Sequence, residues 1–416
     1  MPKQIKDSVP DARPPRGDGY WKLIVALFSL GWVLMYANRL ALSPVLSIIK
    51  QEWGLSKSQL GLLSSAFFLM YTFLQAPSGM IADRIGRKTI LVPGYFIQGL
   101  GGLLSGFAGG FGAFLGARIV AGAGQGTYYS TQYALASEAI PQRRRALGTS
   151  IINSGMSVGI ASGLTIASVM VFRWHLPWRW PFIILAAATI LLSLVMAVVV
   201  REERGARSAA PQTGATSGGA SARAGSIGGL HREGWRTLIL MSIFNLAVMY
   251  GFYVILTWLP YYLQTVRGYS GAEAGLVSTI MPLVAVPAAI FSANFSDRIG
   301  GRRRVMLALL PVAALSLVLI VAVGNRAGLY LALVLYGLAG KLTVDPLMVA
   351  LVADVTPKNA YGSVFGILNF VGSLSMVLAP YITGVLADAT GSFDSGIYLA
   401  AALVVVAWLA LWFVRE

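Results

Sequence analysis

Twelve apolar runs, each bounded by charged residues, glycine or proline, are the feature that most limits what this chain can fold into. Their ranges are 21–46, 58–80, 88–108, 112–137, 147–171, 180–200, 236–262, 273–296, 304–323, 328–353, 360–386 and 394–414. A helix needs about 20 mostly apolar residues to cross the hydrocarbon core of a membrane. Charged residues make up 12% of the 416 positions, whereas soluble domains carry roughly 25%. The sequence therefore predicts an all-α membrane protein with twelve transmembrane helices.

The runs divide into two sets of six, separated by the segment 201–234. This segment starts with charged residues and continues as a Gly-, Ser- and Ala-rich stretch, a composition typical of a flexible linker. We therefore expect an N-terminal six-helix bundle over 1–200, a cytoplasmic linker over 201–234 and a C-terminal six-helix bundle over 235–416.

Short motifs recur at matching places in the two sets. Residues 79–88 read G-M-I-A-D-R-I-G-R-K after the second run, and residues 293–303 read A-N-F-S-D-R-I-G-G-R-R after the eighth. Three further pairs are each 216 positions apart: Glu138 and Asp354, Pro141 and Pro357, and Asn153 and Asn369. Ordered matches of this kind indicate a duplicated unit, and hence two pseudo-symmetric six-helix bundles, as in many transporters.

Lysine and arginine are distributed unevenly between the ends of the runs. If both termini are cytoplasmic, 23 of the 32 lie on the cytoplasmic side, six lie outside, and Arg39, Arg118 and Lys341 lie within runs. This bias follows the positive-inside rule, so the net charge of +16 indicates topology rather than a nucleic-acid partner. We expect a multi-pass protein of the cell membrane with both termini in the cytoplasm and an uncleaved first span.

The loop motif at 79–88, its partial repeat, and the pattern Arg118-x-x-x-Gly122-x-Gly124-x-Gly126 resemble the major facilitator superfamily over essentially the whole chain. Within that superfamily the chain resembles the organic anion:cation symporters, through residues 38–44 (N-R-L-A-L-S-P), residues 257–263 (T-W-L-P-Y-Y-L), Asn369 with Gly372, and Ala379-Pro380. The resemblance implies the major facilitator fold. Relatives typically carry an Asp directly before the helix-1 Arg; Asn38 stands there instead, which speaks against proton coupling at that position.

Ionisable residues inside the runs indicate function first, because a charge at mid-bilayer costs about 3 kcal/mol or more. Arg39 lies about 18 residues into the first run, and its fork of donors matches a carboxylate or a phosphate. We expect Arg39 to anchor an anionic substrate; the alternative is that it extends to the outer interface.

Lys341 and Asp345 lie four positions apart in the tenth run, on one helical face. They form either a neutralising pair or a functional one, in which Asp345 accepts a coupling proton or Lys341 meets the anionic end of the substrate. Pro346 is expected to interrupt this helix locally.

Polar side chains near mid-depth are the candidates for lining a central cavity. A tyrosine can pack apolar surface and offer its hydroxyl to a ligand, although packing is the commoner role of any single one. Besides Arg39 and Lys341, the residues expected to bind substrate are Tyr36, Asn38, Tyr129, Gln132, Asn153, Tyr250 and Asn369.

Charged residues also gather at the expected cytoplasmic ends of both sets. The residues predicted to gate the transporter, through salt bridges between the bundles that hold the outward-open state, are Asp83, Arg84, Arg87, Asp297 and Arg298. Glu138 and Asp354 lie close to these clusters, and Glu138 is a second candidate for carrying the proton. For Arg118, proton transfer and helix packing are both open. Gly155, Gly159 and Gly163 are spaced for close helix packing.

Enzyme signatures are missing from the sequence, which has no Walker A motif, no dinucleotide-binding turn and no zinc-ligand spacing. We expect a monomeric secondary transporter without cofactor or metal, in contact with lipid, that imports a small organic anion, a carboxylate, together with H⁺ by alternating access. One alternative is an antiporter for an organophosphate or a dicarboxylate, held by Arg39 and Lys341. Another is a receptor or sensor that has a transporter fold but does not transport.

Overall fold

The computed structural model describes residues 19–202, 232–357 and 360–414, so most of the linker expected at 201–234 lies outside the described residues. The N-terminal half contains α1 (Tyr20–Leu40), α2 (Leu42–Trp53), α3 (Lys57–Ile85), α4 (Arg87–Gly106), α5 (Phe111–Gly126), α6 (Tyr128–Ala139), η1 (Gln142–Arg144), α7 (Arg145–Ser168), η2 (Val169–Arg173) and α8 (Trp180–Val199). The C-terminal half contains α9 (Arg232–Thr265), α10 (Gly271–Ser278), α11 (Ile280–Ile299), α12 (Arg302–Ala322), α13 (Arg326–Ala339), α14 (Lys341–Val355), α15 (Tyr361–Thr390) and α16 (Asp394–Trp412).

The helices of the described ranges form twelve rods, because four pairs of helices continue one another across a single residue. Those residues are Ala41, Thr127, Thr279 and Gly340. Ten of the rods are long and apolar enough to cross a membrane. The other two are α4 and the pair α5–α6. In them, α4 and α5 each carry five glycines, which lower their hydropathy. The rods match the twelve predicted runs one for one.

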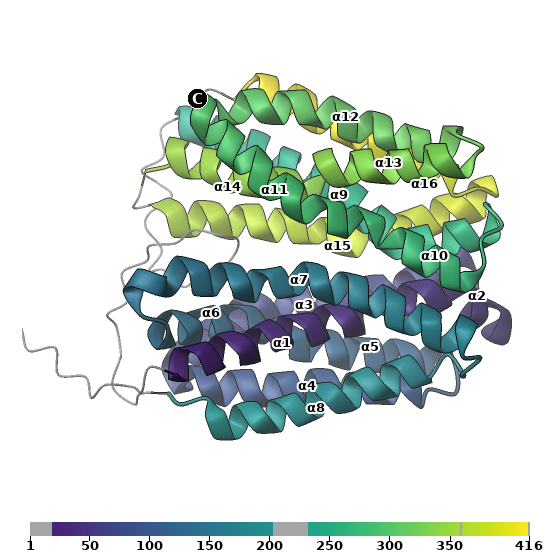
Figure 1. Ribbon diagram of the computed structural model, residues 1–416, viewed down its shortest axis with the longest axis horizontal. Coiled ribbons are helices and arrows are strands. Elements are labelled where there is room, and N and C mark those ends of the chain that lie inside the picture. The colour runs from purple at the N-terminus through teal and green to yellow at the C-terminus, as the bar shows by residue number, and fades with distance from the viewer. Residues whose placement is uncertain (1–18, 203–231, 358–359, 415–416) are drawn as a thin grey trace, which may run out of the picture.

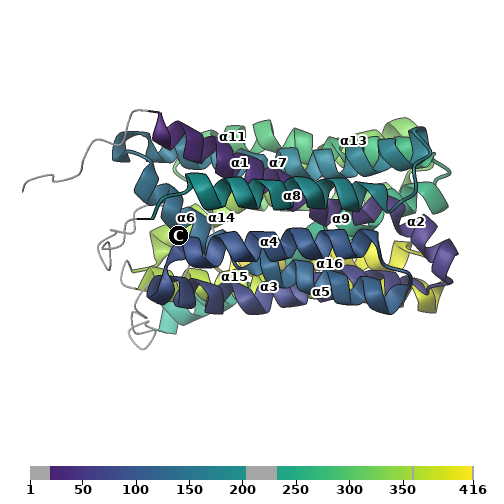
Figure 2. The ribbon, with the colours of Figure 1, turned by 90° about the horizontal axis from the view of Figure 1, so that it is seen from below.

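Figure 1 shows the two halves as two layers of helices that run along a common axis, purple to teal for the N-terminal half and green to yellow for the C-terminal half. Figure 2 shows the helices of the N-terminal half side by side along the same axis. One end of the molecule carries the α3–α4 and α11–α12 turns, and we call it the basic end. The other end carries α2, α10 and the α15–α16 turn, and we call it the opposite end.

A stripe of glycines holds α7 against α1. A Cβ atom on Gly155, Gly159 or Gly163 would lie 2.5–2.6 Å from a backbone oxygen of α1, closer than carbon and oxygen atoms can approach. Only glycine therefore permits this spacing, as the sequence predicted. The contact fixes α1, which carries Arg39, inside its half.

The break in the tenth rod lies at Gly340 and not at the predicted position of Pro346. Pro346 remains inside α14, whereas Gly340 takes an extended conformation with φ −79° and ψ −168°. Proline is best tolerated near the start of a helix, and the break at Gly340 places Pro346 near the start of α14. Lys341 thereby becomes the first residue of α14.

The two halves contact each other closely toward the opposite end. A Cβ atom on Gly61 of α3 would lie 2.3 Å from the Pro380 oxygen of α15. A Cβ atom on Gly275 of α10 would lie 1.7 Å from Oγ of Ser168 in α7. Each half therefore contributes one glycine that lets a helix of the other half approach, and the contacts are related by the pseudo-symmetry of the fold.

Candidate functional site

Arg39 of α1 lies buried in a box of aromatic rings. Its guanidinium carbon is 4.7 Å from the ring centroid of Tyr36, 5.0 Å from those of Phe68 and Tyr71, and 5.6 Å from that of Phe67. The residue is only 4% exposed, and its Nε and Nη2 atoms have no hydrogen-bond partner. The ring faces stabilise the cation, while two donors remain free for an acceptor that is not part of the protein.

A second buried arginine shares one of these rings. The guanidinium of Arg118 lies 4.4 Å from the Phe67 centroid, and its Nε is also without a partner. Within the described residues, neither Arg39 nor Arg118 forms an ion pair. Two positive charges therefore lie next to each other in the N-terminal half without a compensating carboxylate.

The ring box continues into a cluster of aromatic and amide side chains from α1, α6 and α7. Trp32 stacks on Tyr36 at 5.7 Å, and its edge contacts Tyr129, also at 5.7 Å. The Trp32 indole N–H donates to Oε1 of Gln132 at 3.0 Å, and the Tyr133 hydroxyl donates to Oδ1 of Asn153. The structure thus brings together Tyr36, Arg39, Tyr129, Gln132 and Asn153 of the predicted site.

The C-terminal half faces this cluster with Tyr253 of α9. Its ring lies 5.1 Å from that of Phe68, and it is within electrostatic range of both Arg39 and Asp345. Lys341 donates to Oδ2 of Asp345 at 3.1 Å, and the two side chains are 11% and 22% exposed. This pair is therefore close to, but distinct from, the ring box.

A hydrogen-bonded path of amides joins the halves next to the ring box. Asn369 of α15 donates to Oε1 of Gln75 in α3 at 3.3 Å, and Gln75 donates to the Tyr71 hydroxyl at 3.4 Å. Tyr71 in turn borders Arg39. Asn369, one of the predicted site residues, is thereby connected to the ring box through Gln75, which was not among the residues predicted from the sequence.

Two other predicted residues lie apart from this cluster. The Asn38 amide donates to the Leu185 carbonyl and to the Thr189 hydroxyl of α8, so it packs α1 against α8. The Tyr250 hydroxyl is buried next to Thr383 inside the C-terminal half. We therefore do not assign Asn38 and Tyr250 to the substrate site.

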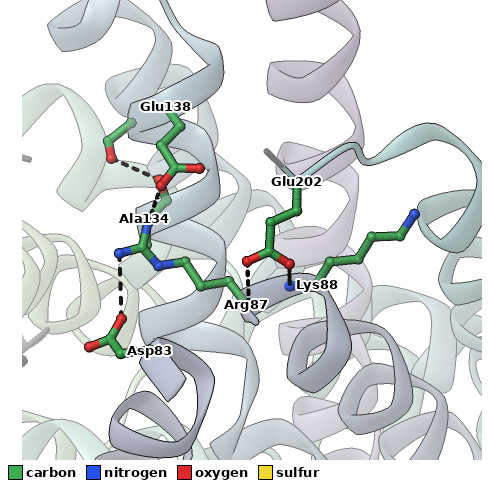
Figure 3. A network of polar contacts seen from close by, with 7 residues as sticks. Asp83, Arg87, Lys88, Ala134, Glu138 and Glu202 are labelled. Atoms are coloured by element: carbon green, nitrogen blue, oxygen red, sulfur yellow. Dashed lines mark hydrogen bonds and ion pairs between the residues drawn. The ribbon is translucent and has the colours of Figure 1, made fainter. Parts of the chain in front are cut away.

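Glu138 lies at the basic end, in a cluster around Arg87. Arg87 pairs with Glu138 and, at 3.4 Å, with Asp83, as Figure 3 shows. The Glu202 carboxylate accepts hydrogen bonds from the backbone N–H groups of Arg87 and Lys88 at 2.6 and 3.0 Å. It therefore caps the N-terminus of α4, where unpaired N–H groups favour an anion.

The C-terminal half repeats this cluster around Arg302. Arg302 pairs with Asp354 and, at 3.5 Å, with Asp297. The ion pairs of each cluster therefore join residues of the same half, whereas the sequence predicts ion pairs between the two halves. The side chains of Arg84 and Arg298 are exposed. Arg302 is the counterpart of Arg87 in the repeated motif, and aligning the two motifs across the extra Gly301 would have identified it.

At the opposite end, the N-terminus of α3 in one half and the C-terminus of α15 in the other half form hydrogen bonds with each other. The Asp388 carboxylate accepts the backbone N–H groups of Lys57 and Ser58 at 3.0 and 2.8 Å. The Lys57 ammonium donates to the carbonyl oxygens of Ala387 and Gly391 at 2.8 and 3.3 Å. We call the Lys57–Asp388 contact the latch, because it links the two halves by charge-assisted hydrogen bonds.

Comparison with known proteins gives consistent matches over nearly the whole chain. The sequence profile of the Major Facilitator Superfamily matches residues 28–272 and 241–416. The chain is similar to a probable sulfoacetate transporter of Cupriavidus necator, with 28% identity over 94% of this chain and 93% of that protein. It is similar to the D-galactonate transporter of Escherichia coli O6:H1, with 25% identity over 95% of each.

Among solved structures, the fold is similar to that of a bacterial homologue of the human lysosomal transporter Spinster, crystallised in an inward-facing, unoccupied conformation. The TM-score is 0.74 at 18% identity, with 95% of this chain and 96% of the other covered. At this identity the likeness bears on the fold alone, and it agrees with twelve rods in two halves.

Proposed function

The chain belongs to the Major Facilitator Superfamily, and on that premise we propose that this membrane transporter imports a small organic anion, a carboxylate, by proton-coupled symport. The relatives named as transporters of sulfoacetate and D-galactonate carry organic acids, which supports an organic anion as the substrate. The observation that carries the proposal is the buried Arg39 guanidinium, which has rings around it and two donors without a partner.

An anion is the ligand that suits Arg39 best. A guanidinium presents parallel N–H donors that match the two oxygens of a carboxylate. Because the Arg39 guanidinium is already shielded from water by the surrounding rings, water competes little with a carboxylate for its N–H donors. We assign Tyr36, Tyr129, Gln132, Asn153 and Asn369 to the surroundings of the bound anion, because each lies in the cluster that contains Arg39 or in the amide path beside it.

Asp345 is our candidate for carrying the proton. Of the 16 acidic residues in the sequence, it is the one that lies well inside an apolar run, and in the structure it pairs with Lys341 near the start of α14. Protonation of Asp345 removes the partner of Lys341 and leaves a free ammonium near the substrate. Glu138 is less well placed, since it pairs with Arg87 at the basic end.

The contacts between the halves support alternating access. Hydrogen bonds from one half to the other lie toward the opposite end and near the centre, as with Ser43 to the Leu256 oxygen and Ser65 to the Val377 oxygen. At the basic end, by contrast, each described polar contact joins two residues of the same half. By the positive-inside rule the basic end faces the cytoplasm of a cell-membrane protein. We propose that the conformation described here is the inward-open one, and that the charge clusters around Arg87 and Arg302 gate the basic end. We also propose that the protein works as a monomer.

Uptake into proteoliposomes tests the proposal. Arg39→Ala is expected to reduce carboxylate uptake driven by an inward proton gradient by at least about 100-fold, since truncating a buried charged partner costs roughly 3 kcal/mol or more. Arg326→Ala removes an exposed arginine at the opposite end and serves as the matched control with unchanged uptake. Wild-type uptake in a correctly inserted and folded Arg39→Ala protein would refute Arg39 as the anchor.

A second candidate function is exchange of a dianion, either an organophosphate or a dicarboxylate. The presence of Arg118 beside Arg39 favours it, because two guanidinium groups on one ring suit two negative charges. Counterflow separates the candidates. Uptake that requires substrate inside the vesicles and ignores the proton gradient supports exchange, whereas uptake driven by the gradient into empty vesicles supports symport.

A further inference from the structure

Helix α3 of the N-terminal half and helix α15 of the C-terminal half contact each other from the opposite end toward the centre of the molecule. The described hydrogen bonds between them start with the latch and continue with Ser65, whose hydroxyl donates to the Val377 oxygen. The one nearest the basic end joins Nδ2 of Asn369 to Oε1 of Gln75 at 3.3 Å. In the inward-open conformation proposed above, this amide contact therefore lies where the two helices begin to separate.

Gln75 also contacts the wall of the Arg39 site. Its Nε2 donates to the Tyr71 hydroxyl at 3.4 Å, and the ring centroid of Tyr71 lies 5.0 Å from the guanidinium carbon of Arg39. Tyr71 and Gln75 are four positions apart in α3, which places them on one helical face. Gln75 is 9% exposed. A single buried side chain thus joins the ring box to the other half of the molecule.

The hydrogen bonds of this path all run in one direction. Asn369 donates to Gln75, Gln75 donates to Tyr71, and no acceptor for the Tyr71 O–H is found among the described residues. The Tyr71 hydroxyl lies within electrostatic range of the Arg39 guanidinium, so we expect its O–H to donate to an anion held there. Groups that donate to one another in sequence polarise each other, and a charged acceptor at the end makes the last bond stronger.

We propose that Gln75 is a positioning residue of the anion site, through which Asn369 of the other half strengthens anion binding without contacting the anion. Coupling of this kind is reciprocal, so an anion at Arg39 also strengthens the contact between α3 and α15 at the centre of the molecule. The inference rests on the proposed function, because it takes an organic anion at Arg39 as given. It adds how binding of that anion is linked to the approach of the two halves.

A double-mutant cycle in anion affinity tests this path. Gluconate and benzoate are the probes, added to the purified full-length protein in lipid nanodiscs, and the cycle uses the one that the wild-type protein binds more tightly. Gln75→Met keeps the length of the side chain but removes both hydrogen bonds, so we expect it to weaken binding about 3- to 10-fold. Asn369→Leu is expected to weaken binding about 2- to 5-fold by itself and to have no further effect in the Gln75→Met protein.

Two other variants complete the design. Tyr71→Phe keeps the ring beside Arg39 and removes only the hydroxyl at the end of the path, so it is expected to weaken binding and to abolish the effect of Asn369→Leu. It replaces Gln75→Met in the cycle if that protein does not fold. Gln51→Met, at an exposed glutamine of α2, is the matched control with unchanged affinity.

The outcomes separate this inference from the proposed function. An effect of Asn369→Leu that persists in the Gln75→Met protein shows that Asn369 contacts the anion directly, and it overturns the role of Gln75. Wild-type affinity in the Gln75→Met protein overturns it as well. Both results leave the proposed anion transport intact. If the folded wild-type protein binds neither probe, the carboxylate substrate of the proposed function is wrong, and the inference fails with it.

Discussion

At the scale of single residues, the proposed function gives Arg39 and Asp345 different electrical roles. The charge of Arg39 is permanent, because a guanidinium does not lose its proton at working pH. The charge of Asp345 is conditional, since a carboxylate can be protonated and its partner Lys341 lies 3.1 Å away. In the proposed function, Arg39 therefore holds the anion throughout the transport cycle, and Asp345 couples that cycle to a proton.

Replacing Asp345 with Asn tests this division of roles. The variant cannot take up a proton at this position, so we expect uptake into proteoliposomes to lose its stimulation by an inward proton gradient. Substrate counterflow is expected to persist, because it does not require a net proton movement. Asp394→Asn, the same substitution at the opposite end, provides the control. Gradient-stimulated uptake by Asp345→Asn would exclude Asp345 as the proton carrier.

At the scale of helices, close packing depends on glycines that face a neighbouring backbone. Gly159 of α7 faces Val33 of α1, where an added Cβ would lie 2.6 Å from a carbonyl oxygen. Gly116 of α5 has no atom within 4 Å of such a Cβ. A larger residue is therefore excluded at Gly159 but has room at Gly116.

We therefore expect Gly159→Ala to lower the thermal unfolding temperature of the purified protein, because α1 and α7 must separate to admit the methyl group. Gly116→Ala is expected to leave that temperature unchanged or raise it, since alanine favours a helix over glycine by about 1 kcal/mol. Thermal unfolding followed by intrinsic fluorescence measures both. A Gly159→Ala protein as stable as the wild type would show that the helices adjust without cost.

At the scale of the whole molecule, the latch joins the two halves at the opposite end. Asp388 caps α3 and Lys57 caps α15, so opening this end leaves both helix ends without their partners. Charge-assisted hydrogen bonds of this kind are stronger than neutral ones. If the protein works by the alternating access proposed above, we expect the balance between its inward-open and outward-open states to depend on this pair.

Asp388→Ala is expected to shift the protein toward the state that is open at the opposite end. The chain has no cysteine, so a single Cys at Ser65, which lies on the interface between the halves, can report this opening. We expect the labelling rate of Ser65→Cys with a membrane-impermeant maleimide, added from that side, to increase several-fold. Glu273→Ala, which removes a carboxylate that pairs within one half, should leave the rate unchanged. No increase for Asp388→Ala would contradict the latch.

The sequence by itself determined the membrane-spanning class, the twelve rods and the repeated unit. These features depend on local properties that each segment carries alone: its apolar length, its charged ends and its motifs. Arg39, Lys341 and Asp345 could be selected for the same reason, because a charge inside an apolar run is visible without any fold. The close packing of the glycine stripe could be predicted from its spacing.

Only the tertiary structure decided what surrounds those charges. Phe67 and Phe68 read as ordinary apolar residues of the third helix, and Tyr253 as one tyrosine among several, until the fold places them around Arg39. Conversely, Asn38 directly precedes Arg39 in the chain but points toward α8, because successive residues of a helix face different directions. Which residues meet depends on the rotation and packing of helices that are far apart in sequence, and no single segment contains that information.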